Sequence, residues 1–335
     1  MAKRREYTAA WLQVEKELGG RFAVHGTAEE QRAAFDALGQ AVGTQLPLLN
    51  RDIQVTDYEY SGLRLRTYRS TIASEESLPI GIFAHGGGFV CGSIDSEDFL
   101  CQALAERVKT VIVSIEYRCA PEHKAPAQLE DMLTGFRWAY NNASIVKGDR
   151  GRVYTIGGSA GGTLALAAAR KILLGHTPLP KNAIKGVVSF APLIFHPENV
   201  PKEFQSEYTA LTQNATDVPL IDAASVKDCI ASLGLKQHDQ DYLMGNDLES
   251  HKLFTSTYVV TCEFDPLRDD GRIMAKSLKD AGVPVRHEHY NGLPHAFWFL
   301  PTLPETESFM RDTVAGIEWV ISQMRNLPDF DRSDG

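Results

Sequence analysis

A serine between glycines has the strongest chemical potential of any residue in this sequence. Gly157–Gly161 (GGSAG) follows an apolar run, Val153–Ile156, and precedes a segment rich in Ala and Leu, Thr163–Leu174. A strand before the motif and a helix after it are the context in which a Gly-x-Ser-x-Gly serine projects from a strained turn. The helix N-terminus behind Ser159 would direct free N–H groups at negative charge that develops beside it. The pattern predicts a nucleophile, although a glycine-rich turn without chemistry fits this stretch equally well.

A second glycine run could supply hydrogen-bond donors for such a serine. His85–Phe89 (HGGGF) follows an apolar strand, and its consecutive glycines let the backbone fold back with N–H groups exposed. The tetrahedral intermediate of acyl transfer carries an oxyanion that needs two or three donors already in place. We expect an oxyanion hole made by Gly87 and Gly88, with Gly86 as their neighbour, and completed by the N–H of Ala160.

A serine hydroxyl also needs a base within hydrogen-bond reach, because it is a poor nucleophile near neutral pH. Of the ten histidines, His295 has the strongest positional claim, since it lies in a turn after the last expected strand. His287 and His289 lie on that strand and are expected to be surface or packing residues. Asp265, at the exit of an apolar strand, can hold one tautomer of His295 and stabilise its charged form. The order Ser159, Asp265, His295 is the chain order of an α/β-hydrolase triad.

Three other carboxylates compete with Asp265 for the role of the acid. Asp269 and Asp270 fall on the following helix, and we expect them to cap it. Glu263 lies two residues back along the strand and is a weaker rival. The charged segment Tyr117–His123 (YRCAPEH) lies between a strand and a helix start, and it predicts a structural hydrogen-bond network under the site.

Strands alternate with helices along most of the chain, which predicts an α/β fold with a mostly parallel sheet covered on both faces. The expected strands are 53–60, 63–69, 79–85, 110–116, 153–157, 184–190, 257–263 and 284–290, and the main helices are 97–108, 128–140, 163–174, 268–281 and 305–324. The hairpin 53–69 supplies an antiparallel edge to this eight-stranded sheet.

Two stretches interrupt the alternation. Residues 6–42 read as two amphipathic helical pieces, and residues 196–253 are polar and contain three prolines, with a helical run near 223–233. We expect a single α/β domain, 1–335, with a cap formed by about 1–50 and 196–253. Such a cap would cover the carboxyl edge of the sheet, where open α/β sheets bind ligands. The tail 329–335 is expected to fray.

Composition narrows the function classes. The chain has 335 residues, 43% hydrophobic and 23% charged, with a net charge of −9, which is typical of a globular protein and argues against nucleic-acid or anionic-membrane partners. The Lys3–Arg5 cluster is interpreted as a solvated terminus. No segment has the length of a membrane span and no signal peptide is recognisable, so we expect a cytoplasmic protein. The sequons at Asn142 and Asn214 are interpreted as chance matches.

The cysteines point to the same compartment. Their number is odd and none has C-x-x-C spacing, which predicts mostly reduced core thiols and no metal site. The five are Cys91, Cys101, Cys119, Cys229 and Cys262.

Five motifs together resemble the hormone-sensitive-lipase-like family of α/β-hydrolase esterases. They are HGGGF, YRCAPEH, GGSAGG, DPLRDDG and GLPHAF, in the family's order, between residues 85 and 297. The resemblance implies that Ser159 is the nucleophile, His295 the general acid/base and Asp265 its partner. It also implies oxyanion donors at Gly87, Gly88 and Ala160, a cap over the site, and hydrolysis of short- to medium-chain esters without a cofactor.

This sequence departs from the family pattern at two positions. The family usually has Asp where this chain has Gly158, and it often has Gly where this chain has Ala296. The first change removes a carboxylate beside the serine, so the sequence does not show which residues support the turn. Neither change affects a member of the triad.

We therefore predict a serine esterase that cleaves small- to medium-chain esters, or a metabolite ester, through an acyl-enzyme on Ser159. One alternative is non-hydrolytic acyl transfer or cyclisation in a biosynthetic pathway, for which Gly158 is the only hint. Another is a receptor-like binding module without turnover, although similar gibberellin receptors have lost the histidine that is present here as His295. The resemblance permits a homodimer through the edge strand Pro284–Tyr290.

The residues that would contact a substrate in the cap are less determined. Five large apolar side chains of the insertion could line an acyl or aryl pocket, or could form the core of the cap. They are Phe195, Phe204, Tyr208, Leu211 and Tyr242.

Overall fold

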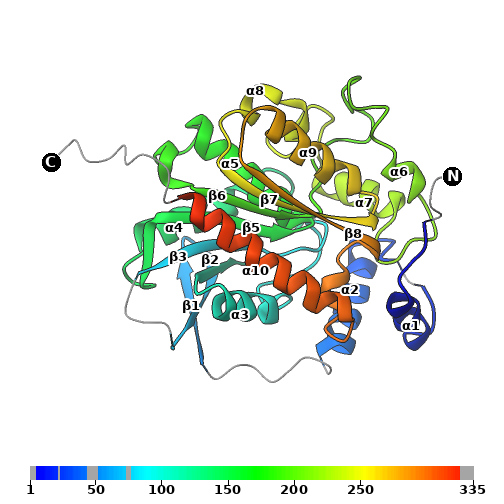
Figure 1. The fold of residues 1–335 in the computed structure, drawn as a ribbon, viewed down its shortest axis with the longest axis horizontal. Helices are drawn as coiled ribbons and strands as arrows, with labels where there is room; N and C mark the ends of the chain where they lie inside the picture. Colours follow the sequence, from blue (N-terminus) through cyan, green and yellow to red (C-terminus); the bar gives the residue numbers. More distant parts are fainter. Residues whose placement is uncertain (1–4, 22, 44–51, 73–76, 325–335) are drawn as a thin grey trace.

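The computed structural model describes residues 5–21, 23–43, 52–72 and 77–324 (Figure 1). These residues form an eight-stranded sheet in the order β1-β2-β4-β3-β5-β6-β7-β8. The strands are β1 Ile53–Tyr60, β2 Leu63–Ser70, β3 Leu78–Ala84, β4 Val111–Ile115, β5 Gly148–Gly158, β6 Gly186–Phe190, β7 Ser256–Phe264 and β8 Val285–Pro294.

The predicted α/β class and mostly parallel sheet are confirmed. β1 pairs antiparallel with β2, and β2 pairs antiparallel with β4, whereas every pairing from β4 across to β8 is parallel. All residues of β3, β4 and β6 are buried, because helices cover both faces of a parallel sheet. The edge strand β1 alternates instead, as expected when one face meets solvent.

The helices are α1 Ala9–Glu17, α2 Ala28–Gly43, α3 Asp98–Arg107, α4 Ala127–Asn141, α5 Ala160–Leu174, α6 Ala210–Gln213, α7 Ala223–Leu233, α8 Leu248–His251, α9 Arg268–Asp280 and α10 Pro304–Met324. Side chains of these helices contribute to two buried apolar clusters. One contains α4, α5 and α9, with Phe136 and Leu164 among its members. The other contains α3 and α10, with Leu104 and Phe309. None of the described helices combines the length and apolarity that crossing a bilayer requires.

Element boundaries agree with the sequence prediction to within about five residues. The largest differences are in β5, which begins at Gly148 rather than Val153, and in β8. This strand continues to Pro294 rather than ending at Tyr290, because after a register shift Pro294 pairs with Phe264. The last strand therefore delivers the chain directly to residue 295. The predicted fraying of 329–335 lies outside the described residues.

The N-terminal arm (residues 5–43) and the insertion (196–253) contact each other near the carboxyl ends of the strands (Figure 1). Ala23 forms a parallel bridge with Leu220, and the N–H of Val24 donates to the carbonyl of Leu220 at 2.8 Å. In the insertion, Asp222 is the N-cap of α7, and its side chain accepts the N–H of Ser225 in a capping box. The helix predicted near 223–233 is thereby confirmed, and it faces the arm.

Candidate active site

Ser159 occupies the turn between β5 and α5 in a strained backbone conformation. Its φ is 55° and its ψ is −121°, a region that residues other than glycine seldom adopt. The turn is held by the Ser159 N–H, which donates to the carbonyl of Phe190 at 2.8 Å. A Cβ atom on Gly161 would collide with the carbonyl oxygen of Ala84, and one on Gly157 would collide with the backbone of Gly161. Glycine is therefore required on both sides of the serine for β5 and α5 to approach.

The structure brings Ser159, His295 and Asp265 together in one hydrogen-bonded chain. Ser159 Oγ lies 2.9 Å from His295 Nε2, and His295 Nδ1 lies 2.9 Å from Asp265 Oδ2. The N–H of Leu267 donates to the other carboxylate oxygen, Oδ1, at 2.8 Å. Because a carboxylate only accepts, the His295 proton is on Nδ1 and the lone pair on Nε2 faces the serine. Asp265 and His295 are both buried, so water does not compete for these bonds.

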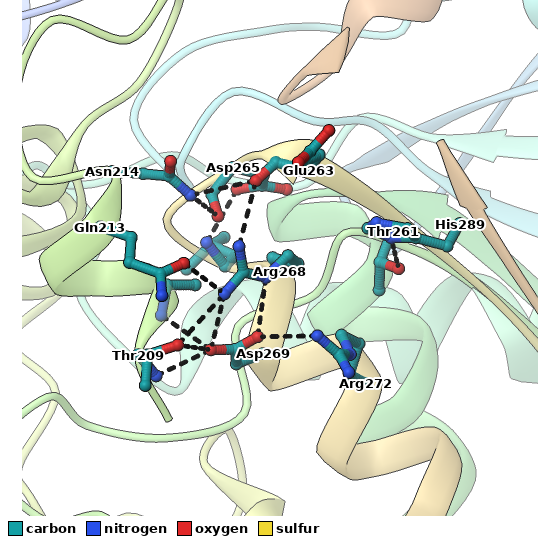
Figure 2. A network of polar contacts seen from close by, with 12 residues as sticks. Thr209, Gln213, Asn214, Thr261, Glu263, Asp265, Arg268, Asp269, Arg272 and His289 are labelled. Carbon is teal, nitrogen blue, oxygen red and sulfur yellow. Dashed lines mark hydrogen bonds and ion pairs between the residues drawn. The ribbon is translucent and has the colours of Figure 1, made fainter. Parts of the chain in front are cut away.

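The other carboxylates of this region bind backbone groups of neighbouring segments. Asp269 accepts the N–H groups of Thr209 (Figure 2) and Ala210 at 2.8 and 2.7 Å. Asp270 accepts the N–H groups of Ile194 and Phe195 at 2.9 and 3.0 Å. Burial raises the pKa of Asp270 to about 7. The expectation that these two residues cap their own helix is wrong, because both carboxylates accept N–H groups of distant chain segments instead.

The two histidines of β8 are packing residues, as predicted. His287 Nε2 and His289 Nδ1 lie 2.8 and 2.9 Å from Thr261 Oγ1 on the neighbouring strand. Figure 2 shows Thr261 on β7 and His289 on β8, apart from the loop that carries Asp265.

The glycine loop after β3 presents free N–H groups beside the serine. Gly87 and Gly88 have φ values of 107° and 62°, in the left-handed region that glycine tolerates best. Both line the same cavity as Ser159 and Ala160. Among the described residues, no acceptor takes the N–H of Gly87, Gly88 or Ala160, so these donors remain available to a substrate oxygen.

Gly86 differs from its neighbours because its N–H is already engaged. It donates to Glu97 Oε2 at 2.7 Å, so Gly86 supports the loop rather than joining the free donors. Tyr117, from the charged segment 117–123, stacks on His85 with ring centroids 3.9 Å apart and donates to the His85 carbonyl at 2.9 Å. The structural network predicted for this segment is confirmed, and Glu97 is a member that the sequence did not reveal.

Glu97 provides a pH-dependent test of this support. Burial raises the pKa of Glu97 from 4.5 to about 8, and the N–H of Gly86 only partly offsets this rise. Between these pH values the unfolded chain loses the proton that the folded chain keeps, so the free energy of unfolding falls as the pH rises. Glu97→Gln can still accept from Gly86 but does not ionise. We expect its stability relative to the wild type to increase by ~4 kcal/mol between pH 4.5 and 8.

Urea unfolding of both proteins at pH 4.5, 6 and 8 measures this difference. Exposed Glu249→Gln is the matched control and should leave the pH dependence of the wild type unchanged. Parallel pH profiles for the wild type and Glu97→Gln would contradict the prediction.

Aromatic packing occupies the side of the turn where the family usually has a carboxylate. A Cβ atom on Gly158 would lie 3.2 Å from Trp298 Cζ2, so the indole already fills this space. Trp298 stacks on Phe309 with centroids 5.0 Å apart and lies next to the ring of His295. Ala296, at the other position where this chain departs from the family pattern, has a φ of 54°, a conformation that favours glycine. Packing thus takes the place of a polar support under the turn.

A cavity of about 90 Å³ opens beside Ser159 and His295. Its walls are almost entirely apolar and come from the arm, the insertion and the loop after His295. They include Val24, Phe35, Leu38, Leu220, Val226 and Phe299. The cavity therefore suits a compact apolar group placed against the serine hydroxyl.

None of the five insertion residues considered from the sequence lines this cavity. Phe195 instead packs against Phe204 and Tyr208, with ring centroids 5.9 and 5.7 Å apart. Of the two readings left open, the structure supports a core role for these rings. The lining from α2 was missed, although the amphipathic spacing of Phe35 and Leu38 was its sequence signal.

Comparisons with known proteins agree with this geometry. A family model described as alpha/beta hydrolase fold matches residues 81–299. A versiconal hemiacetal acetate esterase of Dothistroma septosporum is 41% identical over 96% of this chain and 97% of its own length. This chain belongs to the hormone-sensitive-lipase-like family of α/β-hydrolase carboxylesterases. The present chain is also 29% identical to a versiconal hemiacetal acetate esterase of Aspergillus parasiticus, over 94% of this chain and 98% of that protein.

A solved structure extends the likeness in three dimensions. The crystal structure of vibralactone cyclase matches with a TM-score of 0.85 and 25% identity, covering 97% of this chain and 98% of that one. The relatives named esterases, together with the family match, show that this esterase is a serine-type carboxylic ester hydrolase.

Proposed function

We propose that this esterase removes a short acyl group from an apolar, ring-containing metabolite ester. One observation carries the proposal: the Ser159–His295–Asp265 chain opens into a small apolar cavity beside three free N–H groups. The names of the two versiconal hemiacetal acetate esterases support an acetyl group on a metabolite. An edge-to-face pair, Phe35 and Phe299, with centroids 6.3 Å apart, supports an aromatic or alicyclic partner.

The reaction follows from the positions of the atoms. His295 Nε2 accepts the Ser159 proton as Oγ attacks the ester carbonyl, and Asp265 stabilises the imidazolium through Nδ1. The developing oxyanion accepts from Gly87, Gly88 and Ala160. His295 then protonates the leaving alcohol. In the second half, His295 activates water, which attacks the acyl-enzyme and releases the acid and the free serine.

A chain-length series of p-nitrophenyl esters tests the acyl size. We expect kcat/KM to be highest from acetate to butyrate and to fall at least ~10-fold by octanoate, because longer chains exceed the cavity. Phe35→Ala should enlarge the cavity and shift the optimum to longer chains. Leu18→Ala, an exposed apolar residue of the arm outside the cavity, should not. Peak turnover on octanoate or longer esters in the wild type would contradict the proposal.

Hydrolysis is distinguished from acyl transfer or cyclisation by the fate of water oxygen. With ¹⁸O-labelled water, hydrolysis places the label in the released acid, whereas transfer or ring closure does not. The likeness to a cyclase makes this measurement informative. Label-free products in the presence of active enzyme would favour the non-hydrolytic alternative.

We further propose that residues of about 1–50 and 196–253 form a cap on a single domain, and that the protein is a cytoplasmic homodimer. The bridge between Ala23 and Leu220 supports one continuous cap.

The five free cysteines favour a reducing compartment. β8 is a sheet edge whose unpaired backbone groups could pair with a second copy. Sedimentation at a mass near 37.0 kDa would contradict the dimer.

A further inference from the structure

A fully buried asparagine of the insertion contacts the backbone of the triad acid. Asn214 follows α6, and its Nδ2 donates to the carbonyl oxygens of Asp265 at 2.8 Å and Glu263 at 3.3 Å (Figure 2). Both amide hydrogens thus point at the loop that joins β7 to α9. A buried amide is costly unless its polar atoms are paired, so these contacts hold the side chain in one orientation.

Arg5 determines which way this amide faces. Its Nη2 donates to Asn214 Oδ1 at 2.7 Å and to the Glu263 carbonyl at 2.7 Å. Because a guanidinium only donates, the atom of Asn214 facing it must be the oxygen. The guanidinium also lies 4.5 Å from the ring centroid of Phe264. The interpretation of Lys3–Arg5 as a solvated terminus is therefore wrong for Arg5, whose planar group pairs with carbonyls at the end of β7.

The same part of the arm contacts the end of β8, the strand that leads to the base. Glu263, the weaker rival for the acid, accepts the N–H of Gly292 at 2.7 Å. The N–H of Thr8 donates to the carbonyl of Gly292 at 3.0 Å. Tyr7 stacks on Phe264 with ring centroids 3.8 Å apart. Residues 5–8 thus connect the end of β7, which precedes Asp265, to the end of β8, which precedes His295.

The short helix α6, which precedes Asn214, is itself bound at both ends by side chains of α9. Arg268 Nη2 donates to Gln213 Oε1 at 3.0 Å, and Asp269 accepts the N–H groups at the start of the helix (Figure 2). The Arg268–Asp269 ion pair is buried, at 2.8 Å. A short helix fixed in this way can transmit its position to the backbone that it contacts.

We propose that Asn214, oriented by Arg5, is a positioning residue that holds Asp265 in register with His295. Neither side chain lines the cavity, so its effect reaches the reaction through the triad and not through the substrate. A misplacement of about 1 Å in a catalytic group costs ~10²-fold in rate. The inference rests on the proposed role of the triad, and it gives the arm and insertion a second task besides enclosing the substrate.

Two substitutions at Asn214 test the contact. Asn214→Ala removes the donors. Asn214→Asp keeps the volume and the acceptor for Arg5, but its carboxylate faces two carbonyl oxygens and cannot donate. We expect both to lower kcat for p-nitrophenyl acetate ~10–100-fold, with KM within about twofold. The rate at which an organophosphonate labels Ser159 should fall by the same factor, because labelling depends on the triad and bypasses ester binding.

Asn199→Ala is the matched control. Its amide donates to the Gln237 carbonyl within the insertion and to no residue of the triad loops, so both rates should stay within about twofold of the wild type. Assays run well below each variant's Tm separate positioning from loss of folded protein. An Asn214→Ala enzyme with unchanged kcat, or with a change in KM alone, would overturn the inference.

Arg5 gives a second route if the Asn214 variants do not fold. Arg5→Ala should lower kcat ~10-fold, and Arg5→Lys should restore part of the loss because it keeps a donor for Asn214 Oδ1. Where Asn214→Ala does fold, the loss of kcat in the Arg5→Ala/Asn214→Ala double variant should be clearly smaller than the product of the two single losses. Full activity of Arg5→Ala, or no rescue by lysine, would overturn the pairing. A wild-type protein that neither cleaves esters nor reacts with the organophosphonate would instead refute the proposed function.

Discussion

Replacement of Ser159 by alanine is expected to lower kcat for ester hydrolysis by ~10⁵-fold, with KM changed only slightly. The variant retains the free N–H groups of Gly87 and Gly88 and the apolar cavity, so substrate still binds. It lacks the only hydroxyl within reach of His295 Nε2 in the described site. The remaining activity should correspond to water attack assisted by the oxyanion donors.

Steady-state kinetics on p-nitrophenyl acetate and mass spectrometry after organophosphonate treatment measure this effect. The wild type should carry one label on the peptide that contains Ser159, and the variant should carry none. Thr163→Ser, in the same helix and one turn away, should retain labelling and most activity. Full ester hydrolysis by Ser159→Ala, or a label on another residue, would refute the assignment of the nucleophile.

Asp265→Asn should lower kcat by ~10⁴-fold without unfolding the protein. The N–H of Leu267 binds Oδ1 at 2.8 Å, so the amide oxygen will take that position and the NH₂ group will face His295 Nδ1. The imidazole must then accept at Nδ1 and carry its proton on Nε2. In this tautomer it cannot take the proton from Ser159, although every distance in the site is nearly unchanged.

The control for this prediction is Asp280→Asn, which removes a carboxylate at the exposed end of α9 where it pairs with Lys276. Its kcat should stay within about twofold of the wild type, and both variants should show similar Tm values. If Asp265→Asn retained more than a tenth of the wild-type kcat, another group would have to orient His295. Asp270, whose Oδ1 accepts two backbone N–H groups, would not explain such a result.

Local patterns were sufficient to predict most elements of the fold. β-branched and apolar runs such as Val111–Ile115 become buried strands, and α7 begins and ends where its capping box and Gly234 require. The glycine loop after β3 and the serine turn were also recognisable, because few other sequences satisfy such close backbone approaches. These features depend on residues that are neighbours along the chain.

Long-range contacts were harder to predict. The sequence suggested that Asp269 and Asp270 cap α9, yet their partners lie about 60 and 75 residues away in the chain. Arg5 was interpreted as a solvated charge, although it binds carbonyl and amide oxygens more than 200 residues away. A side chain's type gives its hydrogen-bonding capacity, but not which distant segment will supply the partner.

By itself, the sequence determined the class of fold and predicted the serine turn and the chain order of the proposed triad, because motif spacing and hydrophobic periodicity are local properties. Only the tertiary structure decided that Gly86 binds Glu97, that Trp298 fills the space beside Gly158, and that the arm lines the cavity. Each of these depends on how distant surfaces fill shared volume and satisfy each other's buried polar atoms. Packing of that kind is a property of the whole folded chain.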